Sequence, residues 1–556
     1  MKSSWGRTLL LALLALLAAA PTLADELSEL QKLRDTTINL LNLLVEQGVI
    51  TREKADALIR QAEQGSQPGQ AGSAGSNVAP AGSAAAQQPA TKGPGTPGSA
   101  SAAPTEVKPG VVRVPYIPET VKEEIRDQVK QDVVAEAKRE RWGTPGALPQ
   151  WLDRVTVFGD VRFRGEADRF PTDNVPNATP QQLQLPEFGA YPITNSTDPY
   201  NRLRIRARLG ATADLGTVTT GVRLATGGIG AGGNAASENQ TLGNYNAHEA
   251  IGVDRAFIAY HPVSWFQISG GRIGNPYFER TTLVWATDLS LEGIAATFTP
   301  KVTDQIGVFA TAGAFPILDV PPSPLNSARS KWLYGYQTGL HWQINKDSAL
   351  TFGTALYDYR HLEGIPNPDF LSTVYNSTAA PFRQGGNSVF DINALANTVN
   401  GTQNYLIGLA SKFKELNVST SLDLGFGGRT HVMLDLDYVK NIGFDRSEIL
   451  ERTGLDLAAR NTGAQAQLIV GDPSIARRYA WQALVGYRYV QRDSVVDGFT
   501  DSDFRIGGTD TKGYILGAEF AFETNSTVRV RWMSAKQIDG LPYAVDVLQL
   551  DAITAF

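Results

Sequence analysis

The segment VTVFGDVRFRGEA (residues 155–167) alternates between two kinds of side chain. One parity holds only valine, phenylalanine, glycine and alanine, whereas the other holds the charged residues Asp160, Arg162, Arg164 and Glu166. Successive side chains of a β-strand point to opposite faces of the sheet. A period of two therefore predicts a long strand with one apolar face and one charged face.

The same pattern returns in NRLRIRARLGATA (residues 201–213), where four arginines share one parity and leucine, isoleucine and alanine share the other. Similar alternation recurs at residues 432–438, 481–492, 514–523 and 528–532. Strands of about nine to thirteen residues are long for a soluble sheet, but they match a bilayer crossed at a tilt.

Two architectures explain this alternation. A soluble sandwich turns its apolar face inward and would expose four arginines of one strand to water. A transmembrane barrel turns the apolar face to lipid and the charged face to a wet lumen. The strand length, an N-terminal export signal and aromatic strand ends favour the barrel, the aromatic residues being Trp332, Tyr334, Tyr487, Tyr489 and Trp532.

Short turns alternate with long loops along residues 151–556. The expected long loops are 168–200, 227–249, 273–287, 315–331, 361–404, 441–462, 493–511 and 536–544. This alternation predicts about sixteen antiparallel strands with both ends of the barrel on the periplasmic side, and an even number is typical of single-chain bacterial barrels. The predicted fold class is an all-β transmembrane β-barrel with a small α-helical periplasmic N-terminal region.

The first 150 residues show a different organisation. Residues 1–24 carry a basic start, an apolar stretch and small residues before Asp25, which is typical of a signal peptide. Apolar residues at helical spacing predict a helical hairpin over 25–64, and a Gly/Ser/Ala/Pro-rich linker follows over 65–110. Residues 111–150 contain a charged helix with one apolar residue per turn. It is interpreted either as a coiled-coil oligomerisation stalk or as a helix that lines or plugs the end of the barrel.

Composition excludes several classes of protein. The 556 residues contain no cysteine, which excludes disulfides, Cys-ligated zinc and thiol catalysis. The formal net charge of −6 argues against a polybasic nucleic-acid binder. The five histidines are isolated, with no pair at helical spacing for a metal. We therefore expect no enzyme activity, no catalytic residues, no cofactor and no metal.

Four segments resemble a known family: residues 112–163, GRIGNPYF (271–278), DYVKNIGFD (437–445) and VLQLDAITAF (547–556). They are similar to the “putative porin” family of Gram-negative bacteria, and the resemblance runs from about residue 25 to the end. It implies a porin of the cell outer membrane that contacts membrane lipids and lipopolysaccharide and forms a homotrimer. The terminal Phe556 resembles the signal read by the outer-membrane assembly machinery.

Charged residues on the inward parity are expected to line a pore. They are Arg162, Arg164, Arg202, Arg204, Arg206, Arg208, Arg488, Arg529, Arg531, Asp435, Asp437 and Glu519. For each arginine, the alternative is that it only pairs with a neighbouring carboxylate such as Asp160 or Glu166. The loop Arg272–Asp288 is expected either to fold inward as a constriction or to form a plain outer loop, and its candidate residues are Asn275, Pro276, Tyr277, Phe278, Glu279 and Arg280.

The expected function is a water-filled channel for passive diffusion of small hydrophilic solutes, with a weak preference for anions because arginine stays charged at any relevant pH. The alternative is a structural anchor whose N-terminal helices tether the outer membrane to peptidoglycan or to a periplasmic partner. A conductance measurement separates the two, because an anchor with a plugged lumen passes no current.

Overall fold

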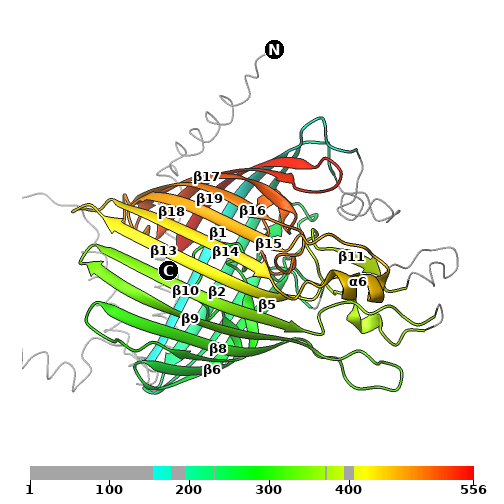
Figure 1. Cartoon of the computed structure of the whole chain (residues 1–556). Helices are drawn as coiled ribbons and strands as arrows, with labels where there is room; N and C mark the ends of the chain where they lie inside the picture. The colour runs from blue at the N-terminus through cyan, green and yellow to red at the C-terminus, as the bar shows by residue number, and fades with distance from the viewer. Residues whose placement is uncertain (1–153, 177–194, 231, 370–371, 394–405) are drawn as a thin grey trace, which may run out of the picture. The chain divides into compact units, whose positions relative to one another are not determined.

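The computed structural model describes residues 154–176, 195–230, 232–369, 372–393 and 406–556 (Figure 1). The predicted signal peptide, helical hairpin, linker and periplasmic helix lie outside the described residues.

Sixteen long strands close into one antiparallel barrel within the described part of the chain. Consecutive long strands pair with each other, and β1 pairs with both β2 and β19, so the sheet has no free edge. The predicted barrel and its strand number are confirmed. The strands are β1 (Val155–Arg169), β2 (Tyr200–Asp214), β3 (Val218–Thr226), β5 (Ile251–Val263), β6 (Phe266–Gly274), β7 (Ser290–Phe298), β8 (Ile306–Leu318), β9 (Lys331–Asn345), β10 (Ser348–Arg360), β13 (Lys414–Gly425), β14 (His431–Asn441), β15 (Thr462–Gly471), β16 (Trp481–Val490), β17 (Thr511–Glu523), β18 (Ser526–Gln537) and β19 (Ala544–Ala555).

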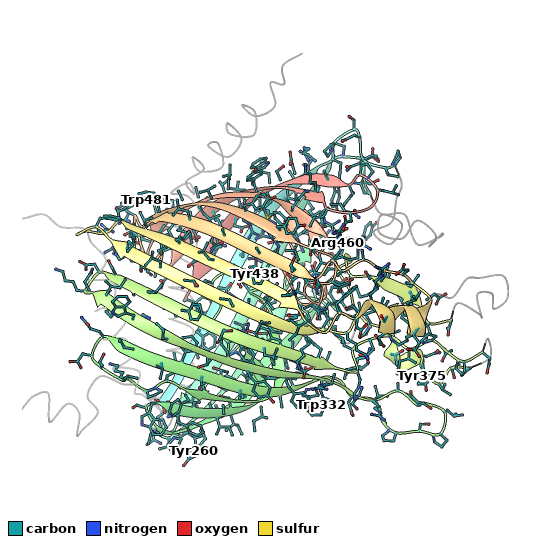
Figure 2. All side chains as sticks on the ribbon, viewed as in Figure 1. Tyr260, Trp332, Tyr375, Tyr438, Arg460 and Trp481 are labelled. Atoms are coloured by element: carbon teal, nitrogen blue, oxygen red, sulfur yellow. The ribbon has the colours of Figure 1, made fainter. Side chains whose placement is uncertain are left out.

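The barrel wall is apolar outside and polar inside. On β1 and β2 the apolar parity is exposed, with Val157 60% and Leu209 52% exposed, whereas Arg164 of the charged parity is 1% exposed. A soluble sandwich would show the opposite burial. Large aromatic side chains lie near both ends of the outer face, as Figure 2 shows for Trp332 at one end and for Tyr260 and Trp481 at the other.

Connections differ in length between the two ends of the barrel. The turn end carries the short connections 215–217, 264–265, 299–305, 346–347, 426–430, 472–480 and 524–525. The loop end carries the long connections, which contain the short strands β4 (Gln240–Thr241), β11 (Val389–Asp391) and β12 (Ile407–Leu409) and the helix α6 (Arg446–Thr453). Because β1 begins and β19 finishes at the turn end, the barrel starts and closes on the same side.

Apolar clusters, among them the following two, stabilise the loops. The larger one lies inside the barrel, where Leu283 and Trp285 from the β6–β7 connection pack with strand residues such as Phe315 and Tyr357. The smaller one lies among the long loops, where Ile449 of α6 packs with residues of β11 and its surroundings. The Asp445 side chain accepts hydrogen bonds from the first N–H groups of α6, and Gly454 in the left-handed region terminates it. No helix in the described ranges is long and apolar enough to cross a membrane.

Candidate functional site

The inner faces of β1 and β2 bring six predicted arginines together. Cross-strand register places Arg162 opposite Arg206 and Arg164 opposite Arg204. Arg208 lies opposite Asp160, and Arg202 opposite Glu166. The chain forms this arrangement because inward parity on both strands is occupied by long charged side chains, which would be costly on a lipid-facing surface.

Every one of these six arginines has a carboxylate oxygen within 3.9 Å, so each of them takes part in an ion pair. Arg206 donates to Asp160 at 2.8 Å, and Arg208 contacts the same carboxylate. Arg202 and Arg204 share Glu166. The arginines therefore form an ion-pair network on the wall and not a row of free charges.

Arg164 is the most enclosed of the six. Its Nε donates to Asp551 on β19 at 2.6 Å, and its Nη1 lies 3.0 Å from Asp503 of the β16–β17 loop. Asp503 also contacts Arg531. The charges of Arg164 and Arg531 hold the pKa of Asp503 well below its usual range, although burial opposes this effect.

The β6–β7 connection, residues 275–289, folds onto the inner face of the barrel. Tyr277 packs edge-on against Tyr357 at 5.0 Å, and the main chain of Phe278 exchanges two hydrogen bonds with the Gln337 side chain at 2.6 and 2.9 Å. Gly335 of β9 makes this packing possible, because an added Cβ there would lie 1.9 Å from the Tyr277 hydroxyl. Asn275 accepts from the Tyr277 N–H and Pro276 lies between them, so the turn keeps the loop tight.

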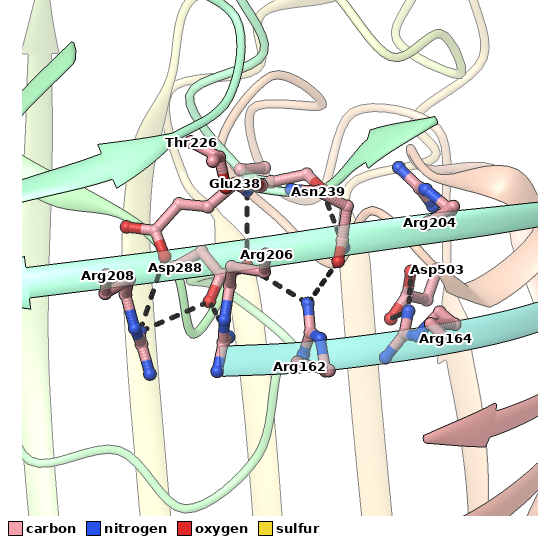
Figure 3. Close-up of polar contacts among 12 residues, drawn as sticks. Arg162, Arg164, Arg204, Arg206, Arg208, Thr226, Glu238, Asn239, Asp288 and Asp503 are labelled. Carbon is pink, nitrogen blue, oxygen red and sulfur yellow. Dashed lines mark hydrogen bonds and ion pairs between the residues drawn. The ribbon is translucent and has the colours of Figure 1, made fainter. Parts of the chain in front are cut away.

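The middle of this loop is attached to the opposite wall. The Arg280 Nε lies 3.4 Å from Asp435, and the Thr281 hydroxyl donates to Asp437 at 2.9 Å. Arg488 of β16 donates to the carbonyl oxygen of Thr282 at 2.7 Å. Figure 3 shows the far end of the loop, where Asp288 lies among Arg162, Arg206 and Arg208. The loop thus runs inside the barrel and ends on the arginine network.

Three of the residues predicted to line the pore, all on later strands, are covered by loops. Arg488, Asp435 and Asp437 face inward, but residues 280–283 and the β16–β17 loop cover them, and Arg488 is 0% exposed. They hold the loop in place through these contacts. Glu519 faces inward on β17 and pairs with Arg529 of β18 at 2.8 Å.

A cavity of about 670 Å³ lies within the barrel beside the arginine network. Its charged lining is Arg162, Arg206, Arg208, Arg223, Arg529, Asp160, Asp288 and Glu519. Phe158, Ile475 and the terminal Phe556 contribute apolar surface toward the turn end. This arrangement offers a polar space that water can enter, bounded by more cationic than anionic side chains.

Sequence reasoning missed several members of this network. Arg223 on β3 contacts Asp254 and lies 3.3 Å from Glu238, which also pairs with Arg208 at 3.4 Å. The alternation along β3 and β19 could have identified Arg223 and Asp551, because both lie at inward positions of their strands. Glu238 lies in a long loop where no periodic signal exists. Burial and the charges of Asp288 and Asp254 raise the pKa of Glu238 to about 7, despite Arg208 and Arg223 nearby.

Histidines and acidic residues form no metal centre in the described part of the chain. His431 lies 2.6 Å from Asp423, and His261 and His341 each share a hydrogen bond with a threonine at 2.9 Å. These are local pairs on strands.

Comparison with known proteins places the whole barrel in a family. The family described as “Putative porin” matches residues 34–556. Similar solved structures include OprB of Pseudomonas putida, 12% identical with a TM-score of 0.42, covering 73% of this chain and 96% of that chain. OmpF of Salmonella typhi in complex with daunomycin is 10% identical with a TM-score of 0.38, covering 72% and 97%. The outer membrane channel DcaP of Acinetobacter baumannii is 10% identical with a TM-score of 0.37, also covering 72% and 97%. No curated protein matches the chain.

Proposed function

Because this chain belongs to the “Putative porin” family, we propose that its barrel is an outer-membrane channel through which small hydrophilic solutes diffuse passively. The observation that carries the proposal is a closed barrel of sixteen strands with an apolar exterior and a charged interior, within the described residues. Such a barrel is wide enough to hold water. The inward-folded residues 275–289 supply the constriction, and the cavity beside the arginine network supplies the aqueous path.

A weak anion preference is the selectivity that the cavity lining favours. Five arginines and three carboxylates line it, which leaves an excess of two positive charges. The preference is weak because ion pairs such as Arg206–Asp160 and Arg529–Glu519 neutralise much of the lining. Ions in a water-filled pore with low-dielectric walls respond mainly to the charge that remains uncompensated.

Planar-bilayer recording of the purified full chain tests both parts of the proposal. We expect a steady conductance and, in a KCl gradient, a reversal potential on the anion side. The double variant Arg208→Gln/Arg529→Gln should shift the permeability ratio severalfold toward cations. Arg446→Gln/Arg360→Gln is the matched control, because both arginines are exposed and outside the cavity lining.

Two results would overturn these proposals separately. Absence of current from folded protein refutes the channel and favours a structural anchor. An unchanged reversal potential in Arg208→Gln/Arg529→Gln refutes only the assigned basis of selectivity.

The predictions for the N-terminal residues can be tested on the same protein. We propose that residues 1–24 direct export, that the helical segments within 25–150 are periplasmic, and that the protein assembles as a homotrimer. Deleting residues 25–110 should leave the conductance intact, because the barrel alone forms the channel.

Cross-linking of the unheated protein should yield a three-chain species, and a single-chain mass would refute the trimer.

A further inference from the structure

Two phenylalanines on the inner wall lie directly opposite glycines of neighbouring strands. Phe158 of β1 is the cross-strand partner of Gly210 on β2, and Phe257 of β5 is the partner of Gly221 on β3. Each ring occupies the space that a side chain at the glycine would take, because an added Cβ would lie 2.6 Å from the Phe158 ring and 2.8 Å from the Phe257 ring. The two rings therefore reach toward each other across the β2–β3 pair. We call these two rings the aromatic platform.

The two rings of the platform are close enough for one small molecule to contact both. In the register of β2 and β3, Thr212 lies opposite Gly221 and Arg223 lies opposite Gly210, so the two covered glycines are diagonal neighbours. Diagonal positions of an antiparallel pair are about 7–8 Å apart. The platform is therefore an apolar surface of small extent on a wall that is otherwise polar and charged.

The platform is open to a solute, whereas two other inward phenylalanines are covered by protein. Phe315 is 0% exposed in the larger apolar core, and Phe309 packs against Phe278 of the inward loop with ring centroids 5.7 Å apart. Phe158 and Phe257 are only half-buried, although one side of Phe257 packs against the same core. Phe158 lines the cavity beside the arginine network, and Phe257 lines a second cavity of about 570 Å³ toward the turn end.

Cationic groups adjoin the platform on the side of the loop end. Arg208 precedes the covered glycine of β2 by two residues, and Arg223 lies opposite that glycine. Their closest carboxylates are Asp160 and Asp254. Glu238 lies farther away, 3.4 Å from Arg208 and 3.3 Å from Arg223, and Figure 3 shows it beside Arg208. Charge-assisted hydrogen bonds are usually about 2.7–2.9 Å long, so Glu238 holds neither guanidinium group tightly.

Arg208 is the arginine of this pair that a solute can reach more easily. Its side chain is 19% exposed, compared with 9% for Arg223, and it lines the same cavity as Phe158. An anionic group and an apolar ring of one solute can therefore be held side by side on this wall. A guanidinium group matches the geometry of a carboxylate, and aromatic rings attract one another in offset or edge-to-face arrangements.

We propose that the aromatic platform and Arg208 form a binding subsite for small aromatic carboxylates. The ring of the solute lies against Phe158 and Phe257, and its carboxylate meets the guanidinium group of Arg208 in competition with Glu238. The inference rests on the proposed channel, because it names a class of solute that would enter its lumen. Aromatic side chains opposite glycine can also serve only to stabilise a sheet, and the test separates the two roles.

The test measures benzoate binding to the purified full chain in detergent by an NMR saturation-transfer titration. We expect the wild type to bind benzoate about tenfold more tightly than acetate, which lacks the ring, or benzyl alcohol, which lacks the charge. Phe158→Ala/Phe257→Ala should weaken benzoate binding by about tenfold and leave acetate binding unchanged. Phe163→Ala/Phe520→Ala is the matched control, because it removes two outward phenylalanines that are each 46% exposed, and it should bind benzoate as the wild type does.

Three results would overturn the inference. Equal benzoate affinity in the two double variants would leave the platform a purely structural role. Equal wild-type affinity for benzoate and benzyl alcohol would show that the arginine end contributes nothing, and equal affinity for benzoate and acetate would show the same for the rings.

A second variant keeps the inference testable if Phe158→Ala/Phe257→Ala fails to fold. Phe158→Leu/Phe257→Leu retains apolar volume but has no flat ring, so it should lose the wild-type preference for benzoate over cyclohexanecarboxylate. An unchanged preference would overturn the inference. Binding in detergent and current in a bilayer are separate readouts. A chain that binds benzoate but passes no current refutes only the channel, and one that conducts without binding benzoate refutes only the subsite.

Discussion

At the residue scale, most charged side chains on the inner wall are held by ion pairs with side chains of other strands or loops. Arg164 illustrates this best: its partners Asp503 and Asp551 lie more than three hundred residues away in sequence. Sequence parity correctly assigns Arg164 to the charged face, because that depends only on neighbouring residues. The identity of its partners depends on barrel closure and on a loop that enters the lumen, and neither leaves a local pattern.

Glu279 is a carboxylate in the inward-folded loop whose Oε2 has no hydrogen-bond partner within the described residues. Burial and the nearby charge of Asp437 raise its pKa from 4.5 to about 8, although Asn275 opposes the shift. The native state therefore retains a proton that the unfolded chain loses between these two pH values. The contribution of Glu279 to stability is consequently present below about pH 4.5 and lost as the pH rises toward 8.

We predict that Glu279→Gln flattens part of this dependence. Between pH 5 and 9 the free energy of unfolding of the wild type should fall, and that of the variant should fall less, by an amount on the order of 2 kcal/mol. The measurement is thermal unfolding in detergent at each pH. Because burial also raises the pKa values of Glu238 and Asp493, a residual slope of the same sign should persist. Glu249→Gln is the matched control, at a half-buried loop carboxylate that accepts a hydrogen bond from Asn244, and it should keep the wild-type slope. Parallel slopes for Glu279→Gln and the wild type would contradict the prediction.

At the element scale, the β6–β7 connection is the segment that we propose as the constriction. Its sequence, with Asn275-Pro276 and two aromatics, was compatible with an inward loop or a plain outer loop. The structure shows why it folds inward: small inward residues on β8 and β9, such as Gly313 and Gly335, leave room for Tyr277. The apolar loop side chains fit in shape against the small residues of β8 and β9 only when the barrel is closed.

We predict that Gly335→Val displaces Tyr277 and loosens this loop. Overpacking of this kind typically costs about 1–3 kcal/mol, and the released constriction should give a larger and noisier single-channel current. Gly307→Val is the matched control on the neighbouring strand β8, because the nearest atom to a Cβ there is the Pro300 carbonyl oxygen at 3.8 Å. The same current from both variants would show that residues 275–289 do not limit conductance.

At the scale of the whole molecule, closure between β1 and β19 decides whether a barrel exists. The Phe556 N–H and carbonyl each form a hydrogen bond of 3.0 Å with Gly159, and the ring lies over this glycine. A Cβ at residue 159 would lie 2.7 Å from the ring. The last residue therefore completes the final pair of strands.

We predict that Phe556→Ala lowers the yield of folded barrel severalfold, and that deletion of Phe556 lowers it further, because only the deletion also removes the two main-chain hydrogen bonds. The measurement is the fraction of protein that migrates as the folded form on an unheated gel after refolding. Thr554→Ala is the control on the same strand, because it shortens an outward side chain and leaves the chain end intact. Equal yields for the wild type and both Phe556 variants would refute a role in closure.

The sequence by itself determined the barrel, its strand number of about sixteen and the inward face of the charges on β1 and β2, because side-chain alternation and turn spacing are local properties of the chain. Tertiary structure alone decided which charges are free. It joined Arg206 and Arg208 to Asp160, placed Asp288 among three arginines, and covered Arg488 with the inward loop. These contacts join segments that are distant in sequence, so their energies depend on closure of the sheet and on the volume left inside it.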